Sequence, residues 1–498
     1  MNVYLDQLGS IAPELTLTLT CLVVLVQDLV QRGKNSNSVG AVTLVGLGIC
    51  CAQLLGQWDE PTRTVFGMVE VDRFANFFKL FTVVSLAAVV LFVLCDRRER
   101  KQGVGEYYFL LLGAGIGIFF MVGTNNLLLL MLGLELLSLA SYSLAGFHKG
   151  DRKSAEASMK YVIFGGLSAG IMLYGISLLY GITGTIDLAQ MGSSVGTSLS
   201  SDLATQIHKS PIPIAVAVVM ILGGFAYKIS VVPFHFWTPD VYEGAPTPVT
   251  TFLAVASKAA GFGALLRFVG ALFLKAGVSG EVAAYGERIG LLLAIVAAIT
   301  MTLGNLAALR QSSLKRMLAY SSIAHAGYAL IGVATMTSAG FETAMYYLAA
   351  YYLMNLGAFG FLLYFEGITG SDAIDNLKGM GWKAPVVSIT MVAFLVSLTG
   401  LPPTVGFYGK YLLFVEGYQS GLGWLVLVAA LNSVISLFYY FRIAKALFLA
   451  DPSERTAAPQ PVFVGFLLLL GVGTLVLGIY TSPLVDWAKS SLDILSRA

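Results

Sequence analysis

The chain has 498 residues, of which 57% are hydrophobic and only 12% are charged. Soluble proteins contain about 25% charged residues, so this composition excludes an ordinary soluble enzyme. The formal net charge of +2 gives no reason to expect a nucleic-acid partner.

Apolar runs of about 20 residues recur along the chain, and each can cross the hydrocarbon core of a bilayer as a helix. We predict an all-α polytopic membrane protein, because the helix satisfies its own backbone polar groups in lipid. Residues 1–10 lack the basic region and cleavage site of a signal peptide. Hydropathy predicts about fourteen transmembrane helices, which begin near residues 11, 38, 74, 107, 125, 156, 211, 249, 285, 315, 341, 386, 420 and 460.

Basic residues are unevenly divided between the two sets of predicted loops. The loops after odd-numbered spans carry most of them, including Arg97, Lys149 and Arg442, whereas the long segment 185–210 after the sixth span holds only Lys209. By the positive-inside rule the loops after odd-numbered spans face the cytoplasm. An even number of spans then places both termini on the opposite side. The alternative is that these basic loops bind a partner protein.

The sequence resembles itself at an offset of 186 residues, the separation of Met131 and Met317. The clearest match is GITG at 181–184 with GITG at 367–370. Each copy holds five predicted spans, and because five is odd the copies enter the membrane from opposite sides. Inverted repeats of this kind are typical of ion-coupled transporters, although chance similarity among apolar helices is the alternative. The predicted units are N-terminal spans at 1–105, a first repeat at 106–275, a second repeat at 276–450 and a C-terminal span at 451–498.

Prolines break two of the predicted spans, the seventh and the twelfth. Pro233 lacks the N–H that would bond the carbonyl of Ile229, and Pro402 and Pro403 free two carbonyls in the same way. Freed carbonyls within a membrane need water, a side chain or an ion as a partner. Both breaks lie close to a lysine, which favours a functional site over a simple kink.

Several ionisable side chains lie within the apolar runs. A charge at bilayer depth costs at least about 2.5–3.5 kcal/mol on insertion scales, so a group of them indicates movement of ions or protons. The residues predicted to transfer protons are Glu135, Lys228, Lys258, His325, Lys315 and Lys410.

The predicted order of transfer begins at a glutamate–lysine pair. Burial disfavours the charged form of either group, and direct pairing offsets that penalty until a motion separates them. Glu135 and Lys228 form such a pair if the fifth and seventh spans touch. Lys258 then takes a proton from Lys228, His325 relays it and Lys410 leads to the far side.

Each of these residues also has a structural alternative. The two lysines of the first repeat could only neutralise Glu135, His325 could be a satisfied core residue, and Lys315 could only extend to the membrane interface. No GxGxxG, P-loop, metal-ligand spacing or nucleophile–base signature is present. The four cysteines form no CxxC pair. Any redox centre is therefore expected in a partner.

Five stretches of the chain resemble the antiporter-like subunits of proton-pumping NADH:quinone oxidoreductase (complex I). They span residues 133–147, 160–184, 225–262, 314–328 and 400–414, and the most specific contains KISVVPFHFWTPDVYEGAPTPVT. The similarity is greatest to the N-type subunits, counterparts of mitochondrial subunit 2. Lys410 argues against the M type, which carries glutamate there. No segment after the fourteenth span is expected to supply the lateral helix of the longer L type.

This resemblance implies two inverted five-helix repeats with broken spans seven and twelve, and proton-transfer roles for the six residues named above. It implies a non-catalytic proton-pumping subunit of a translocase that holds no cofactor, with FMN and iron–sulfur clusters in partner subunits. The expected partners are an M-type antiporter-like subunit, small K- and J-type membrane subunits, a peripheral NADH-oxidising arm and phospholipids, with no nucleic acid. The expected location is a bacterial inner membrane with both termini periplasmic.

Two other hypotheses remain. The chain could belong to a related cation/proton antiporter or membrane-bound hydrogenase complex, in which the same buried residues move a different cation. It could also be a passive scaffold whose ionisable groups only neutralise one another.

Overall fold

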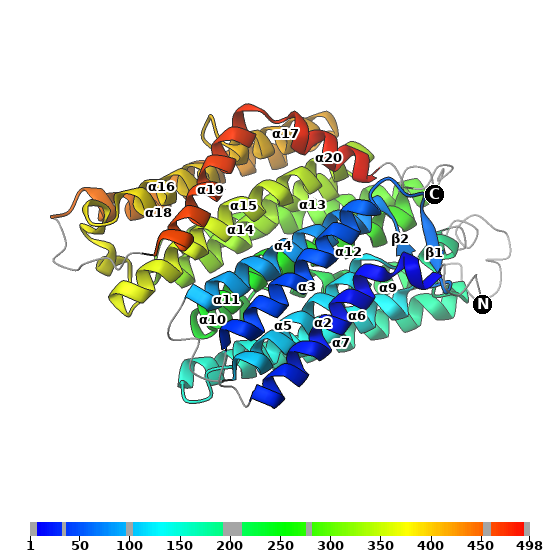
Figure 1. The fold of residues 1–498 in the computed structure, drawn as a ribbon. Coiled ribbons are helices and arrows are strands. Elements are labelled where there is room, and N and C mark those ends of the chain that lie inside the picture. The colour runs from blue at the N-terminus through cyan, green and yellow to red at the C-terminus, as the bar shows by residue number, and fades with distance from the viewer. Residues whose placement is uncertain are drawn as a thin grey trace.

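The computed structural model describes residues 7–31, 36–95, 103–192, 212–274, 281–451 and 460–492. Within these ranges, helices run side by side in one elongated bundle (Figure 1). Thirteen of these helices are long and apolar enough to cross a membrane. The predicted all-α polytopic membrane protein is confirmed.

The first three spans are joined in part by a hairpin. Strands β1 (Arg63–Val65) and β2 (Val69–Val71) pair antiparallel between the second and third spans. The three spans are α2 (Ala12–Gln31), α3 (Ser36–Gly56) and α4 (Arg73–Cys95).

The next group of helices contains the first predicted break. In chain order it comprises α5 (Val104–Val122), α6 (Leu127–Ala145), α7 (Arg152–Thr183), α9 (Ile212–Ile229), α10 (Trp237–Gly244), α11 (Thr247–Phe252), the π-helical segment η3 (Leu253–Ser257) and α12 (Lys258–Phe273). The seventh span thus ends at Ile229 and resumes as the short helix α10 beyond Pro233, as predicted.

The last group contains the second break. It comprises α13 (Glu281–Ala308), α14 (Leu314–Ala334), α15 (Ser338–Thr369), the short 3-10 helices η4 (Ile374–Leu377) and η5 (Met380–Trp382), α16 (Pro385–Thr399), α17 (Val405–Gln419), α18 (Gly423–Phe448), α19 (Pro461–Ile479) and α20 (Ser482–Leu492). The twelfth span is the pair α16 and α17, interrupted at the two prolines. With this pair, the thirteen long helices give the fourteen spans that hydropathy predicts.

Corresponding elements of the two repeats have the same local structure. Helices α7 and α15 both have 32 residues, and both end at a glycine in the left-handed region, Gly184 (φ 70°) and Gly370 (φ 71°). Asn126 caps α6 and pairs with Asp187, while Ser313 caps α14 and pairs with Ala373 in the same way. The first pairing joins the loops after spans four and six, and the second joins the loops after spans nine and eleven. The same device therefore lies at opposite ends of the bundle, as an inverted repeat requires.

Different elements lie at the two ends of the bundle. At one end, which we call the hairpin end, lie the β1–β2 hairpin and α20 (Figure 1). Ile11 packs on the hairpin, and the rings of Trp487 and Trp58 contact each other in a tilted arrangement (centroids 6.0 Å apart). The loops after even-numbered spans gather there. Helix α10 and the loops after odd-numbered spans lie at the other end, the α10 end (Figure 1).

Burial separates the central spans from the peripheral ones. The span Thr247–Phe273, α14 and α15 are almost completely buried, whereas α2, α7, α18 and α19 expose most of their apolar surface. In a membrane, that surface meets lipid or other subunits. The buried central helices carry Lys258, Lys315 and His325.

Candidate functional site

Lys228 occupies the last turn of α9, directly before the first break. A cation is favoured at this end of a helix by the helix dipole. The side chain is buried, and its Nζ atom donates a hydrogen bond to the Ser138 hydroxyl group of α6 (3.2 Å). The predicted direct pair with Glu135 is not formed among the described residues. Glu135 is half-buried beside the exposed Leu132, so the interior-facing Ser138 takes its place as the partner of Lys228.

The first break is held by groups other than its lysine. The Val232 N–H donates to the Thr300 hydroxyl group of α13 (3.1 Å), and the Trp237 indole N–H donates to the Tyr227 carbonyl (3.1 Å). These bonds satisfy backbone groups that a continuous helix would have paired internally. Lys228 is consequently not needed to close this break.

Lys258 is the first residue of α12, directly after the π-helical segment η3. Such segments are rare and often mark functional sites. The Lys258 ammonium group is buried and donates to both the carbonyl (2.8 Å) and the hydroxyl group (2.5 Å) of Ser322 on α14. Tyr351 of α15 donates to the same Ser322 hydroxyl group (2.7 Å). The lysine therefore lies in a hydroxyl-rich site, and no carboxylate of the described residues pairs with it.

His325 links two tyrosines on different helices. Its Nδ1 atom lies 2.6 Å from the Tyr347 hydroxyl group, and its Nε2 atom lies 3.1 Å from the Tyr440 hydroxyl group. A neutral imidazole has one donor and one acceptor nitrogen, so it can bond both hydroxyl groups at once. Exchanging the two tautomers moves a proton from one side of the ring to the other.

Lys410 fills the second break. Its Nζ atom donates to the carbonyls of Leu398 (3.1 Å) and Thr399 (2.9 Å), the groups freed by the two prolines. A third bond reaches the Ser433 hydroxyl group (3.1 Å), and the ammonium group lies 4.3 Å from the centre of the Tyr328 ring. The freed carbonyls thus have a lysine as their partner.

Aromatic contacts join the sites of Lys258 and Lys410. The His325 ring lies 5.2 Å from the Tyr351 ring, which belongs to the Lys258 site, and 5.8 Å from the Tyr328 ring, which belongs to the Lys410 site. Lys258, His325 and Lys410 therefore form one contiguous row. Sequence reasoning did not identify these tyrosines, although Tyr347 and Tyr351 lie one helical turn apart on the same face of the eleventh predicted span.

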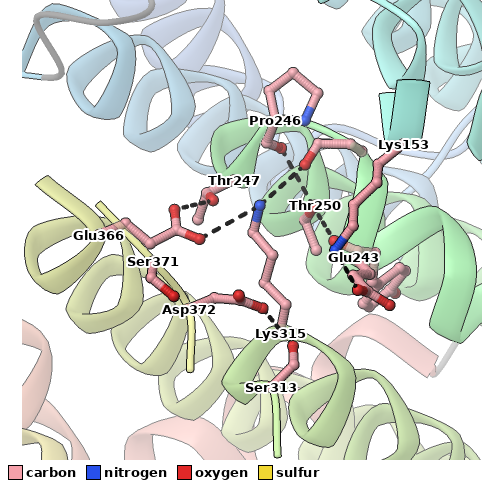
Figure 2. A network of polar contacts seen from close by, with 12 residues as sticks. Lys153, Glu243, Pro246, Thr247, Thr250, Ser313, Lys315, Glu366, Ser371 and Asp372 are labelled. Atoms are coloured by element: carbon pink, nitrogen blue, oxygen red, sulfur yellow. Dashed lines mark hydrogen bonds and ion pairs between the residues drawn. The ribbon is translucent and has the colours of Figure 1, made fainter. Parts of the chain in front are cut away.

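Lys315 lies outside this row, in a buried polar cluster at the α10 end (Figure 2). Its Nζ atom lies 3.4 Å from a carboxylate oxygen of Glu366 and donates to the Ala245 carbonyl (3.1 Å). Glu366 also accepts a hydrogen bond from the Thr247 hydroxyl group (2.5 Å). Lys315 is therefore an ion-paired interior residue here and does not extend to solvent. Its partner Glu366, at the end of α15, was not identified from the sequence.

An ion-pair network holds α10 against α7 and α14. Arg316 bonds Asp240 (2.7 Å) and Glu243 (2.8 Å), Lys160 bonds Asp240 (2.6 Å) and Lys153 bonds Glu243 (2.8 Å). Burial alone would raise the pKa of the Asp240 carboxyl group, but hydrogen bonds from Lys160 and Arg316 lower that pKa below its usual range. The pKa of Glu243 is lowered in the same way by Lys153 and Arg316. Both carboxylates are thus charged at neutral pH.

Two further buried ion pairs lie among the first spans. Arg267 of α12 donates two hydrogen bonds to Asp72 (both 2.9 Å), and Lys79 of α4 bonds Glu14 of α2 (2.5 Å). These pairs connect the N-terminal spans to the first repeat and to one another. Sequence reasoning missed them because their members are far apart along the chain.

The family of the chain follows from its similarity to known proteins. Residues 124–436 match the family described as NADH:quinone oxidoreductase/Mrp antiporter, transmembrane. The chain belongs to this family. The expectation from the sequence motifs, a resemblance to the antiporter-like subunits of complex I, is confirmed.

Full-length relatives agree with this assignment. The chain is 41% identical to NADH-quinone oxidoreductase subunit N of Anaeromyxobacter sp. (strain Fw109-5), over 97% of this chain and 96% of the relative. It is 40% identical to the subunit N of Chlorobium chlorochromatii (strain CaD3), over 98% and 95%. These relatives cover nearly the entire chain, so the similarity extends to the spans outside the two repeats.

Solved structures show the same fold. A chain of respiratory complex I from Thermus thermophilus with bound aureothin superposes with a TM-score of 0.79 at 32% identity, over 96% of this chain and 100% of that chain. A chain of the Mrp complex from Dietzia sp. DQ12-45-1b superposes with a TM-score of 0.84 at 21% identity, over 98% and 97%. The second likeness concerns the fold alone.

Proposed function

We propose that this chain is a proton-translocating membrane subunit of an NADH:quinone oxidoreductase, and that its buried lysines and histidine carry the protons. The observation that supports this most directly is the contiguous row from Lys258 through Tyr351, His325 and Tyr328 to Lys410. Ring contacts place an imidazole and tyrosine side chains between its lysines, and the imidazole and hydroxyl groups can both donate and accept protons. A row of this kind suits stepwise proton transfer.

Glu135 and Lys228 are proposed to control the charge next to the start of this row. Lys228 bonds the Ser138 hydroxyl group, and Glu135 lies one turn before Ser138 on α6. Its Oε1 atom accepts no hydrogen bond from the residues that the structure describes. A small motion of α6 against α9 would exchange Ser138 for Glu135 as the partner of Lys228. Because a carboxylate favours the charged lysine and a hydroxyl group does so less, this exchange would bind or release a proton.

The chemistry of the partners argues against a passive scaffold. Of the five lysine and histidine residues in the proposed proton-transfer set, only Lys315 forms an ion pair with a carboxylate within the described residues. Lys228, Lys258 and Lys410 bond hydroxyl groups and carbonyls. A scaffold with its charges neutralised in pairs would show the opposite pattern.

The assembly is proposed by analogy with the named relatives. The chain would join an M-type antiporter-like subunit, small K- and J-type subunits, phospholipids and a peripheral NADH-oxidising arm that holds FMN and iron–sulfur clusters, while binding no cofactor itself. It would act as the non-catalytic pumping part of a translocase in a bacterial inner membrane. The α10 end would face the cytoplasm and both termini the periplasm. The proposed units are 1–105, 106–275, 276–450 and 451–498.

Replacing the lysines of the first repeat tests this function. In membrane vesicles that contain the assembled complex, Lys228→Ala and Lys258→Ala are expected to abolish most NADH-driven proton translocation and to slow NADH:quinone turnover in parallel. Lys378→Ala is the matched control, because Lys378 pairs with Asp375 at the exposed surface. Normal proton translocation by both lysine variants, with the complex intact, would remove the central claim.

A cation/proton antiporter is the second candidate, because the matching family description includes Mrp antiporters and the Mrp fold superposes over 98% of this chain. The two candidates differ in the ion that drives transport. Sodium-dependent proton movement in proteoliposomes, without NADH or quinone, would favour the antiporter. Its absence, together with NADH-driven pumping, would favour the oxidoreductase subunit.

A further inference from the structure

A polar pocket lies at the α10 end, away from the row of lysines. Its volume is about 340 Å³, and its walls come from both repeats: Lys153 and Glu243 on one side, and Lys315, Glu366 and Asp372 on the other (Figure 2). A pocket of this size and polarity can hold several water molecules. Pumping as proposed requires protons to enter from this end, and none of the residues in the row reaches it.

Glu366 connects this pocket to the interior. The residue is only 8% exposed, lines the pocket, and accepts the hydrogen bond of Thr247 at the start of α11. The contact with Lys315 holds its carboxylate in this orientation. From Thr247 the helix runs directly to Lys258, and the buried residues Thr247 and Thr251 lie one turn apart on the same face of its first part. Glu366 therefore stands at the outer end of a path that leads to Lys258.

Tyr242 occupies the inner end of this path. Its side chain is fully buried, yet its hydroxyl group makes no hydrogen bond within the described residues. The Ser322 side chain, which bonds Lys258, lies next to this hydroxyl group. Thr250 fixes the backbone of Tyr242 against α11 by donating to its carbonyl (3.1 Å). A buried hydroxyl group without a partner is unfavourable, and the one of Tyr242 lies beside the serine that bonds Lys258.

We propose that the pocket is the proton entrance to Lys258, with Glu366 as its first acceptor and Tyr242 as its last donor. Glu366 takes a proton from water in the pocket and passes it along the α11 face to the oxygen of Tyr242. Tyr242 gives up its own proton through the Ser322 hydroxyl group to the neutral Lys258 amine. The carboxylate and both hydroxyl groups are regenerated, and one proton has moved from the pocket to form the Lys258 ammonium group. This inference rests on the proposed function.

Tyr242→Phe is the most direct test, because it removes a hydroxyl group that makes no hydrogen bond and keeps the ring. Assembly and thermal stability of the complex are expected to stay unchanged, while NADH-driven proton translocation in membrane vesicles is largely lost. Tyr352→Phe is the matched control. That tyrosine is also buried, and its hydroxyl group also makes no hydrogen bond in the described part of the chain, but its ring packs on Phe81 of α4. Proton translocation at the wild-type rate in Tyr242→Phe would overturn the proposal.

Glu366 is tested by a pair of variants. Glu366→Gln keeps the shape and the Thr247 contact but cannot be protonated as a carboxylate, so proton translocation is expected to be lost. Glu366→Asp keeps a carboxylate and is expected to restore part of the proton translocation. Thermal unfolding of both variants is measured in parallel, because a purely structural role of the Lys315 contact would lower the stability of the Gln variant together with its pumping. Asp375→Asn, an exposed carboxylate in the following loop, is the control.

Lys258→Ala separates this inference from the proposed function. If Lys258→Ala pumps normally, the proposed function itself fails. If Lys258→Ala abolishes pumping while Tyr242→Phe and Glu366→Gln both pump normally, the function stands and the entrance is wrong. Loss of pumping in all three variants, with both controls active, supports the entrance.

Discussion

The two helix breaks occupy corresponding places in the two repeats, yet their lysines are bound differently. At the second break, Lys410 donates to both freed carbonyls and lies against the Tyr328 ring. At the first break, Lys228 bonds only Ser138 of a neighbouring helix among the described residues, and the backbone of the break is satisfied by Thr300 and other groups. The same sequence device, a lysine beside a proline break, thus has two physical outcomes.

This difference separates two roles of a buried lysine: stabilising a helix break and transferring a proton. The charge of Lys410 is part of the structure of its break, so losing that proton also weakens two backbone hydrogen bonds. Lys228 bonds the Ser138 hydroxyl group and has the Glu135 carboxylate nearby, so it can exchange this partner with little loss of free energy. We therefore infer that the first break is the one that responds to a local change and that the second is the more rigid.

The largest expected effect comes from replacing each lysine by methionine, which has a similar length but no charge. Lys410→Met leaves the Leu398 and Thr399 carbonyls without a partner, at a cost of about 1–3 kcal/mol for each group. Lys228→Met removes a buried charge and strands only the Ser138 hydroxyl group, so stability should change little. Thermal unfolding of the solubilised complex measures both, and pumping should be lost in both. Equal losses of stability would contradict the proposed division of roles.

A smaller effect is expected from Thr300→Val at the first break. The substitution removes the acceptor of the Val232 N–H while keeping the branched shape, and a lost hydrogen bond of this kind costs about 1 kcal/mol. Thr300→Ser, which keeps the hydroxyl group, is the control. The melting temperature should fall in the valine variant only. The hydrogen bonds that Lys410 donates at the second break should be unaffected. A valine variant as stable as wild type would mean that other groups hold the first break.

Much of this arrangement could be predicted from the sequence because its causes are local. The proline positions alone locate both breaks and identify the carbonyls that need partners, and Lys410 lies within a dozen residues of those carbonyls. The constant offset of the repeat predicted corresponding spans, and α7 and α15 have the same length and the same glycine ends. Hydropathy predicted fourteen spans because lipid imposes one length on every crossing.

The remaining contacts depend on which helices are neighbours, and the sequence contains no such information. Lys315 and Glu366 lie on different spans, and Arg267 pairs with Asp72 across most of the first half of the chain. The predicted direct contact between Glu135 and Lys228 is not formed among the described residues for the same reason. Predicting this contact required knowledge of which helices are neighbours and also of the rotation of α6 about its axis, which directs Ser138 and not Glu135 towards the lysine.

The smallest expected effect is a dependence on pH that is confined to the first break. Asp240 and Glu243 anchor α10 through ion pairs, and their pKa values are lowered relative to the unfolded chain. A carboxylate with a lowered pKa stabilises the folded state above its unfolded pKa of about 4, and this contribution is lost as pH falls through the lower folded value. The stability difference between wild type and the double variant Asp240→Asn, Glu243→Gln should therefore be present at pH 7 and shrink below about pH 4.

The corresponding difference for Lys410→Met should not shrink on acidification, because the partners of Lys410 are carbonyls, a hydroxyl group and an aromatic ring that do not gain protons. Thermal unfolding of the three proteins at both pH values measures the two differences, and parallel behaviour would mean that the ion-pair network around α10 does not distinguish the two breaks.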